Sequence, residues 1–280
     1  MADFPRTTVG GVSLSRMIIG TNWFLGFSHH SAAKDKFIRE FQTRDNVADI
    51  LTTFFESGID TVMGMPTPML TEAVKIAEDR TGRERILILT PGMALTPDGP
   101  EPGAPEAAFD RAKELGAKFC FPHTSVTDQL LDPLRGEIRF YPELAKMIRD
   151  RDMIPGLSTH LPQSVIITDN QDYDVAAYIQ IYNAAGFLMP VEADWVMRVI
   201  RNAKRPVMTI KPMAAGRLLP AVGLAFAWST IRDQDMVTVG TTTPDEAKEL
   251  IEISLDLLGR RVPGNELQKT RSKKVLEAKA

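Results

Sequence analysis

The amino-acid sequence predicts an α/β protein built as a single (β/α)8 TIM barrel over residues 1–280. Eight short apolar runs recur along the chain, and segments with one apolar helical face separate them. Continuous apolar runs are typical of strands buried on both faces, and eight strand–helix units in about 250 residues are the number that closes a barrel. A doubly wound parallel sheet is the alternative, which is disfavoured because no glycine-rich dinucleotide loop follows the first run.

The predicted strands follow in chain order from the apolar runs. The segment TTVGGVSLS alternates around Gly10 and Gly11, which predicts an N-terminal β-hairpin that caps one end of the barrel. The eight predicted barrel strands, rich in Val, Ile, Leu, Met and Phe, are 16–23, 58–64, 85–90, 117–123, 153–160, 175–183, 206–211 and 236–241.

Helices are predicted wherever apolar residues recur with a period near 3.6 residues. The segment 46–56 has this spacing, and the segments 141–152 and 194–204 repeat it. A further helix is predicted between Pro105 and Gly116, because proline favours the first helical turn and glycine the end of a helix. The last predicted helix opens with Thr243, Pro244 and Glu246, which form a capping box.

Composition excludes several function classes. The net charge of −3 leaves no basic footprint for nucleic acid or an anionic membrane. The single cysteine, Cys120, excludes an internal disulfide and lies in an apolar run, as a core residue does. No apolar stretch approaches the roughly 18 residues of a membrane span, and the opening MADFPRTT has no apolar signal region. We therefore expect a cytoplasmic protein whose partner is a small molecule.

The four histidines all follow predicted strands. His29 and His30 lie in the loop after the first run, His123 ends the fourth run and His160 ends the fifth. Because the chemistry of such barrels sits at the carboxyl ends of the strands, we expect these imidazoles to converge on one face. They suit either proton transfer or a divalent metal ion held by His123, His160 and one of His29 or His30. The alternative is that the histidines are solvated or merely hydrogen-bonded. No recognisable ligand motif supports the metal site.

Two further charged residues belong to predicted strands. Lys211 ends the seventh run, where burial would lower its pKa and suit it to base or Schiff-base chemistry, unless an acid pairs with it. Asp60 lies inside the second run and needs a partner, so it either supports the site or forms a structural ion pair.

The end of the last predicted strand suggests an anion site. Gly240, Thr241, Thr242 and Thr243 lead directly into a helix, whose free N–H groups and dipole favour a phosphate. A plain N-cap at Thr243 is the simpler alternative.

Three segments of the chain resemble the aldo-keto reductase family: VGGVSLSRMIIGTNWF, GIDTVMGMPTPMLTEAV and GLAFAWSTIRDQDMVTVGTTTPDEAKELIE. The resemblance implies a (β/α)8 barrel that binds NADPH without a Rossmann motif, and a catalytic aspartate, tyrosine, lysine and histidine. Asp60 and His123 match two of these four positions. Met65 stands where the tyrosine is expected, and Thr90 and Pro91 stand where the lysine is expected.

Three functions are compatible with these residues. The first is an enzyme with non-redox acid–base chemistry, metal-assisted or not, acting as a lyase or isomerase on a small carbonyl or sugar-like compound. His123 would be its acid and base, with Lys211 and His160 assisting and Asp60 as support. The second is an NAD(P)-dependent oxidoreductase with a rearranged proton donor, and the third is an inactive barrel retained for binding. NADP and a divalent metal are both open as cofactors.

Overall fold

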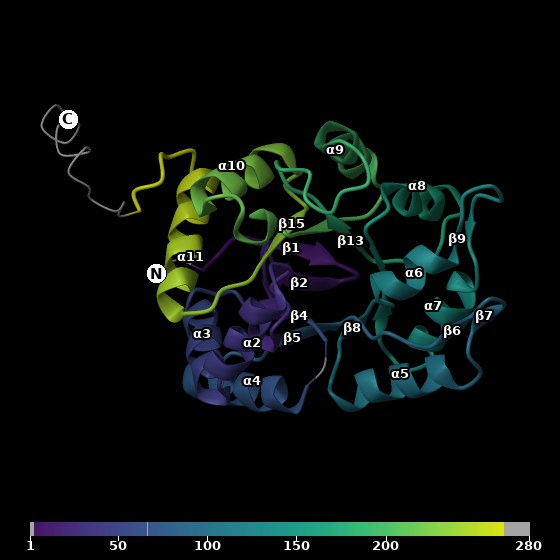
Figure 1. The fold of residues 1–280 in the computed structure, drawn as a ribbon, viewed down its shortest axis with the longest axis horizontal. Coiled ribbons are helices and arrows are strands. Elements are labelled where there is room, and N and C mark those ends of the chain that lie inside the picture. Colours follow the sequence, from purple (N-terminus) through teal and green to yellow (C-terminus); the bar gives the residue numbers. More distant parts are fainter. Residues whose placement is uncertain (1–2, 66, 266–280) are drawn as a thin grey trace, which may run out of the picture.

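The computed structural model describes residues 3–65 and 67–265, which form the predicted (β/α)8 TIM barrel with its N-terminal hairpin (Figure 1). A strand lies within each of the eight predicted runs. The strands are β3 (Met17–Gly20), β4 (Thr61–Gly64), β5 (Ile86–Leu89), β8 (Phe119–Cys120), β11 (Ile154–Pro155) with β12 (Leu157–Thr159), β13 (Tyr178–Ile181), β14 (Val207–Ile210) and β15 (Met236–Val239).

The fifth barrel strand closes the sheet, because its two halves pair with different neighbours. The strand order is β11-β8-β5-β4-β3-β15-β14-β13-β12, and every pairing within it is parallel. Gly156 separates β11 from β12, and a Cβ atom at this position would lie 2.2 Å from the ring of Phe121. A glycine is therefore required where the fifth strand turns from one neighbour to the other.

Among the described residues, eight helices cover the outside of the barrel (Figure 1). They are α3 (Arg44–Glu56), α4 (Pro68–Thr81), α5 (Ala104–Glu114), α7 (Tyr141–Arg149), α8 (Pro162–Asn170), α9 (Ala193–Asn202), α10 (Pro220–Thr230) and α11 (Pro244–Leu258). The five helices predicted by range, α3, α5, α7, α9 and α11, are among them. The loops carry α1 (Asn22–Leu25), α2 (Ala32–Phe41), α6 (Thr124–Leu130), the short η1 turn (Ala214–Gly216) and two small ladders, β6 (Leu95–Thr96) with β7 (Gly99–Pro100) and β9 (Leu131–Asp132) with β10 (Glu137–Ile138). No helix in the described ranges is both long and apolar enough to cross a lipid bilayer.

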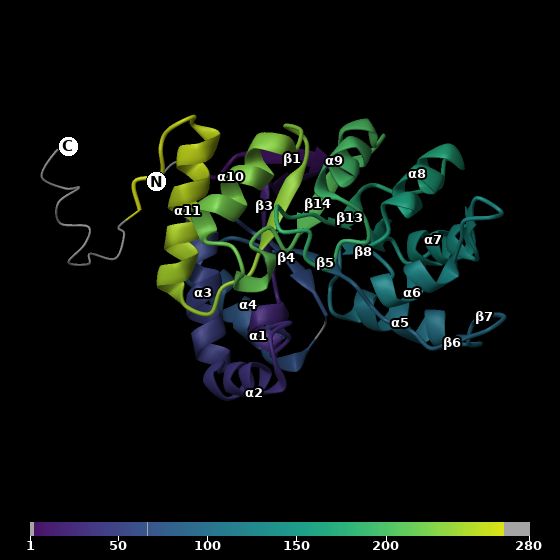
Figure 2. The same cartoon turned by 45° about the horizontal axis from the view of Figure 1, so that its top comes forward.

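The N-terminal hairpin closes the amino end of the barrel. Strands β1 (Arg6–Val9) and β2 (Val12–Ser15) pair around the predicted turn at Gly10 and Gly11. Val9 and Leu14 belong to the apolar cluster inside the barrel, together with Ile18, Ile88 and Met208. In Figure 2, β1 lies at the top and α1 and α2 lie at the bottom, so the hairpin and these helices occupy opposite ends of β3. The carboxyl ends of the strands are therefore left open for a site.

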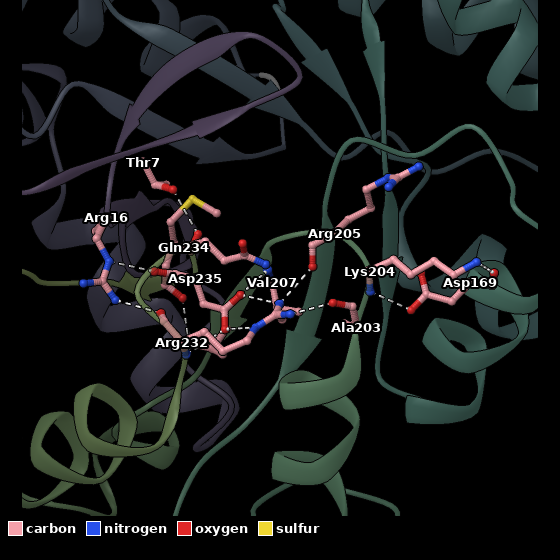
Figure 3. A network of polar contacts seen from close by, with 12 residues as sticks. Thr7, Arg16, Asp169, Ala203, Lys204, Arg205, Val207, Arg232, Gln234 and Asp235 are labelled. Atoms are coloured by element: carbon pink, nitrogen blue, oxygen red, sulfur yellow. Dashed lines mark hydrogen bonds and ion pairs between the residues drawn. The ribbon is translucent and has the colours of Figure 1, made fainter.

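A buried carboxylate ties three barrel strands together at the amino end (Figure 3). Asp235, fully buried, accepts hydrogen bonds from the backbone N–H of Val207 at 2.9 Å and from the guanidinium of Arg232 at 2.7 and 2.8 Å. Arg16 donates to the carbonyl oxygens of Asp235 at 3.0 Å and Arg232 at 2.9 Å. These bonds hold the starts of β3, β14 and β15 in register.

We predict that Asp235→Asn lowers the free energy of unfolding by about 3–5 kcal/mol, because it leaves the Arg232 guanidinium partly buried without its counter-charge. Urea denaturation followed by circular dichroism measures the change. The matched control is Asp174→Asn, which breaks an exposed 2.8 Å pair with Arg149 and should cost less than about 1 kcal/mol. Equal effects of the two substitutions would contradict the role given to Asp235.

Candidate active site

A cavity of about 570 Å³ opens at the carboxyl ends of the barrel strands. The cavity is lined by residues at or just after the carboxyl ends of seven of the eight strands. The remaining strand, β13, contributes Ile179 from within the strand. The lining residues that can bind or react are Thr21, His29, Lys34, His123, Ser158, His160, Lys211, Thr238, Thr241, Thr242, Glu246 and Glu249. Its volume and its position are those of ligand sites in barrels of this architecture.

The structure brings His29, His123 and His160 together around this cavity, whereas His30 lies beside it. The Nε2 atom of His30 contacts the carbonyl oxygen of Ala215, and its ring meets the edge of Trp23 with 6.1 Å between ring centres. Arg217 donates to the carbonyl oxygen of His29 at 3.3 Å. The loop after β3 is thus joined across the mouth of the cavity to the loop after β14.

Lys211 lies directly after β14 and lines the same cavity without an acidic partner. Burial is what lowers the pKa of its ammonium to about 8, and no carboxylate of the described residues offsets this effect. The predicted alternative, a lysine paired with an acid, is therefore wrong. Lys211 also has a φ of +58°, a backbone conformation that is rare outside glycine and tends to occur at functional sites.

The three cavity histidines are held in the neutral form. Burial, followed by the positive charge of Lys211, lowers the pKa of His29, His123 and His160, in the last case to about 4. The Nδ1 atom of His123 accepts the backbone N–H of Ser125 at 3.2 Å, which places its proton on Nε2. At neutral pH the cavity therefore holds three uncharged imidazoles near Lys211, the lining amine whose pKa is lowered.

Asp128, which no sequence motif indicates, fixes the backbone beside the two strand-end histidines. Its carboxylate accepts hydrogen bonds from the Thr124 hydroxyl at 2.6 Å, the Thr159 hydroxyl at 2.5 Å and the backbone N–H of His160 at 3.0 Å. It thereby joins the start of α6, just after His123, to the end of β12. Asp128 is on α6 rather than at a strand end, so the strand-end rule could not find it.

Three buried hydroxyl groups on the wall of the cavity have no hydrogen-bond partner in the described part of the chain. They belong to Thr21, Thr238 and Thr241, which are 1%, 7% and 3% exposed. Buried hydroxyls normally find a partner, and neighbouring atoms cover the oxygens of these three. Only Thr241 is among the residues predicted from the sequence, because Thr21 and Thr238 carry no motif beyond their nearness to strand ends.

The predicted metal site formed by His29, His30, His123 and His160 is wrong. Across residues 3–65 and 67–265, no three His, Cys, Asp or Glu side chains are grouped so that they could hold a metal ion. His30 is turned to the Ala215 carbonyl, and the cationic Lys211 lies near the remaining three rings. A metal ion would therefore lack His30 as a ligand and would be repelled by the positive charge of Lys211.

Asp60 does not support the cavity, contrary to its predicted catalytic role. It precedes β4, whereas the cavity begins at Met63 and Gly64 at the other end of that strand. Its carboxylate pairs with Arg6 of the hairpin at 2.9 Å. The structural ion pair, the other alternative given by the sequence, is thus the correct one.

At the predicted phosphate site before α11, side chains of the protein itself already accept hydrogen bonds from several of the donors. Gly240, Thr241 and Thr242 line the cavity, whereas Thr243 caps the helix and accepts the backbone N–H of Glu246 at 3.2 Å. The Glu246 carboxylate accepts the N–H and the hydroxyl of Thr242 at 2.7 and 2.8 Å. Glu249 lines the cavity nearby, so a phosphate here would meet two carboxylates and displace one of them.

Comparison with known proteins identifies the fold. No family model and no curated protein matches the chain. A protein from Pseudomonas aeruginosa, provisionally named an aldo-keto reductase, superposes with a TM-score of 0.66 and 15% identity over 91% of this chain and 98% of that one. An aldo-keto reductase from Brucella melitensis gives 0.57 and 13% over 93% and 96%. The Amycolatopsis orientalis BexX/CysO complex gives 0.55 and 16% over 96% and 100%. The chain has an aldo-keto reductase-like fold.

The residues of this aldo-keto reductase-like barrel differ from the catalytic set that the resemblance implies. Met65 stands in the tyrosine position, and none of the four tyrosines, all within the described residues, lines the cavity. Thr90, in the lysine position, does line it. Of the catalytic residues that the resemblance implies, His123 is the one that lines the cavity in the described part of the chain. Lys211 lines the same cavity from a different strand, β14.

We predict that Lys211→Met raises the pKa of His123 and His160, because it removes the positive charge that helps keep both rings neutral. Proton–nitrogen NMR of the histidine rings during a pH titration measures both values. In the unsubstituted protein the His160 ring should stay neutral on acidification to about pH 4. Unchanged histidine titrations in a folded Lys211→Met variant would contradict this electrostatic coupling.

Proposed function

We propose that this protein is an enzyme that catalyses non-redox acid–base chemistry, as a lyase or isomerase, on a small carbonyl or sugar-like compound. One observation carries the proposal: Lys211, His123 and His160 line one cavity at the carboxyl ends of the strands. An amine with a pKa near 8 and neutral imidazoles can exchange protons in the neutral pH range. The cytoplasmic location and the lack of nucleic-acid or membrane partners stay predictions.

His123 acts in this mechanism as the group that moves the proton. Its Nε2 carries a proton that can be given to a carbonyl oxygen, and the imidazole can take a proton from the adjacent carbon in a second step. His160 is a second neutral imidazole that can relay this proton. Lys211, when charged, stabilises the negative charge that develops on the substrate oxygen.

We predict that the protein exchanges the protons next to the carbonyl of small hydroxy-aldehydes and hydroxy-ketones in deuterated water without any nicotinamide. Proton NMR of glyceraldehyde, dihydroxyacetone and hydroxyacetone follows the loss of these signals. His123→Ala should slow the exchange by about 100-fold or more, the usual contribution of a general acid or base. Asp174→Asn is the control that should not change the rate. No exchange of any of the three compounds by folded protein would contradict the proposal.

An oxidoreductase is the second candidate, and the likeness to solved aldo-keto reductases favours it. A bound nicotinamide cofactor would supply a hydride to the substrate. Whether such a cofactor fits depends on the residues that line the cavity. The α11 end of the cavity has Glu246 and Glu249 in its lining, and Gly240, Thr241 and Thr242 offer no positive charge to the 2′-phosphate of NADP. These residues do not fit that phosphate, and NADH would be the less hindered cofactor.

We predict that NADPH causes no saturable fluorescence change below about 1 mM, which corresponds to a binding free energy weaker than about −4 kcal/mol. Glu246→Gln should tighten NADPH binding at least about fivefold, because a like charge about 4 Å away costs about 1–4 kcal/mol. Glu252→Gln, an exposed change on the same helix, is the matched control. Micromolar binding of NADPH or NADH by the unsubstituted protein would favour the oxidoreductase instead.

A further inference from the structure

The chain segment that follows β14 fixes where Lys211 lies. Lys211, Ala214 and Ala215 have φ values of +58°, +50° and +55°, so three non-glycine residues adopt the left-handed conformation within five positions. The N–H of Ala214 donates to the carbonyl oxygen of Lys211 at 2.9 Å and closes this turn. Such a sharp turn at a strand end holds the side chain in one direction, and backbone strain of this kind is characteristic of functional sites.

The surroundings of Lys211 differ from those of the lysines on the surface. Lys146 pairs with Asp150 at 2.6 Å and Lys36 with Glu40 at 3.7 Å, and both lysines are largely exposed. Lys211 is partly buried, and no carboxylate of the described residues lies within ion-pair distance of it. Apolar side chains, among them Ile179 and Ile210, line the cavity with it. An amine without a counter-ion in such a cavity is present in part as the neutral nucleophile.

We propose that the Nζ atom of Lys211 forms a covalent imine with the carbonyl carbon of a neutral hydroxy-aldehyde or hydroxy-ketone. The proposal rests on the proposed function and deepens it, because it names the atom that binds the substrate and the class of compound that is bound.

The chemistry balances without any further reactant. The lone pair of Nζ attacks the carbonyl carbon, and the π electrons move to the oxygen, which takes a proton. Nitrogen then loses a proton, the hydroxyl group takes another proton and leaves as water, and the nitrogen lone pair forms the C=N bond. The net reaction joins one ammonium and one carbonyl to give one protonated imine and one water. His123 and His160 line the same cavity and can carry these protons.

A protonated imine favours the next step of an acid–base reaction. It withdraws electrons from the adjacent carbon more strongly than the free carbonyl does, so a neighbouring C–H or C–C bond breaks more readily. A neutral imidazole, at His123 or His160, can take the proton from such a C–H bond, and the imidazolium that forms can give it back, so that the electrons return to the carbon. Attack of water on the imine then reverses its formation and frees the amine.

The charged groups on the cavity wall select the substrate class. Glu246 and Glu249 repel a phosphate or carboxylate at the α11 end. A short uncharged sugar or keto-alcohol therefore fits better than a sugar phosphate.

Reductive trapping tests this proposal on the full chain. The protein is incubated with dihydroxyacetone, glycolaldehyde or glyceraldehyde and sodium cyanoborohydride, then digested and analysed by mass spectrometry. We expect one adduct per chain on the peptide that contains Lys211, ahead of the surface lysines. The yield should rise as the pH passes through about 8, because the neutral amine is the attacking form. Lys211→Arg keeps the positive charge but cannot form the imine, so it should abolish this adduct; Lys146→Arg is the matched surface control.

The proton-exchange assay, run on the same variants, separates this proposal from the proposed function. An adduct on Lys211 together with loss of exchange in Lys211→Arg and Lys211→Met supports both. Exchange that persists in both variants, with no adduct on the unsubstituted protein, overturns the imine and leaves the acid–base function standing. An adduct on Lys211 without exchange supports the imine and overturns the acid–base function. Labelling spread evenly over the surface lysines, or absent, overturns the imine.

Discussion

Closure of the parallel sheet is the constraint on which the rest of the structure depends. The fifth strand pairs with β8 through β11 and with β13 through β12, and Gly156 allows the change of partner because no side chain fits against Phe121 there. Parallel pairing points every strand in the same direction and closure brings their ends around one mouth, so His123, His160 and Lys211 line one cavity although they are far apart in the sequence. An open sheet would leave the first and last of these groups at distant edges.

Charged side chains are arranged differently at the two ends of the closed barrel. At the amino end the charges are paired: Asp235 with Arg232 at 2.7 Å, and Asp60 with Arg6 at 2.9 Å. At the carboxyl end Lys211 has no such partner within the described residues, and burial, followed by the charge of Lys211, lowers the pKa of the neighbouring imidazoles and keeps them neutral. Burial of an uncompensated amine costs free energy, and the paired charges and the hairpin core at the other end supply the stability that tolerates it.

The sequence predicts what depends on periodicity and strand direction, and it does not predict what depends on contacts across the fold. The eight strands, the hairpin and the convergence of His29, His123, His160 and Lys211 follow from local pattern and the direction of parallel strands. The partner of Asp60 could not be predicted, because Arg6 lies 54 positions away in the chain. Asp128 acts through hydrogen bonds to two different elements. The metal hypothesis failed because convergence at one rim does not group three ligands: His30 is turned to Ala215, and the charge of Lys211 lies near the other three rings.

The position of Lys211 around the barrel argues for chemistry other than the family pattern. Around the ring of eight strands, β14 lies four positions from β5, the strand after which the resemblance places a lysine. His123, after β8, keeps the position that the resemblance gives it, and Lys211 enters the cavity from β14, three strands further around the ring. A carbonyl compound bound in the cavity would meet the imidazole and the amine from different strands. Lys211 is thereby separated from the β5 wall, where the resemblance would have a lysine assist a tyrosine.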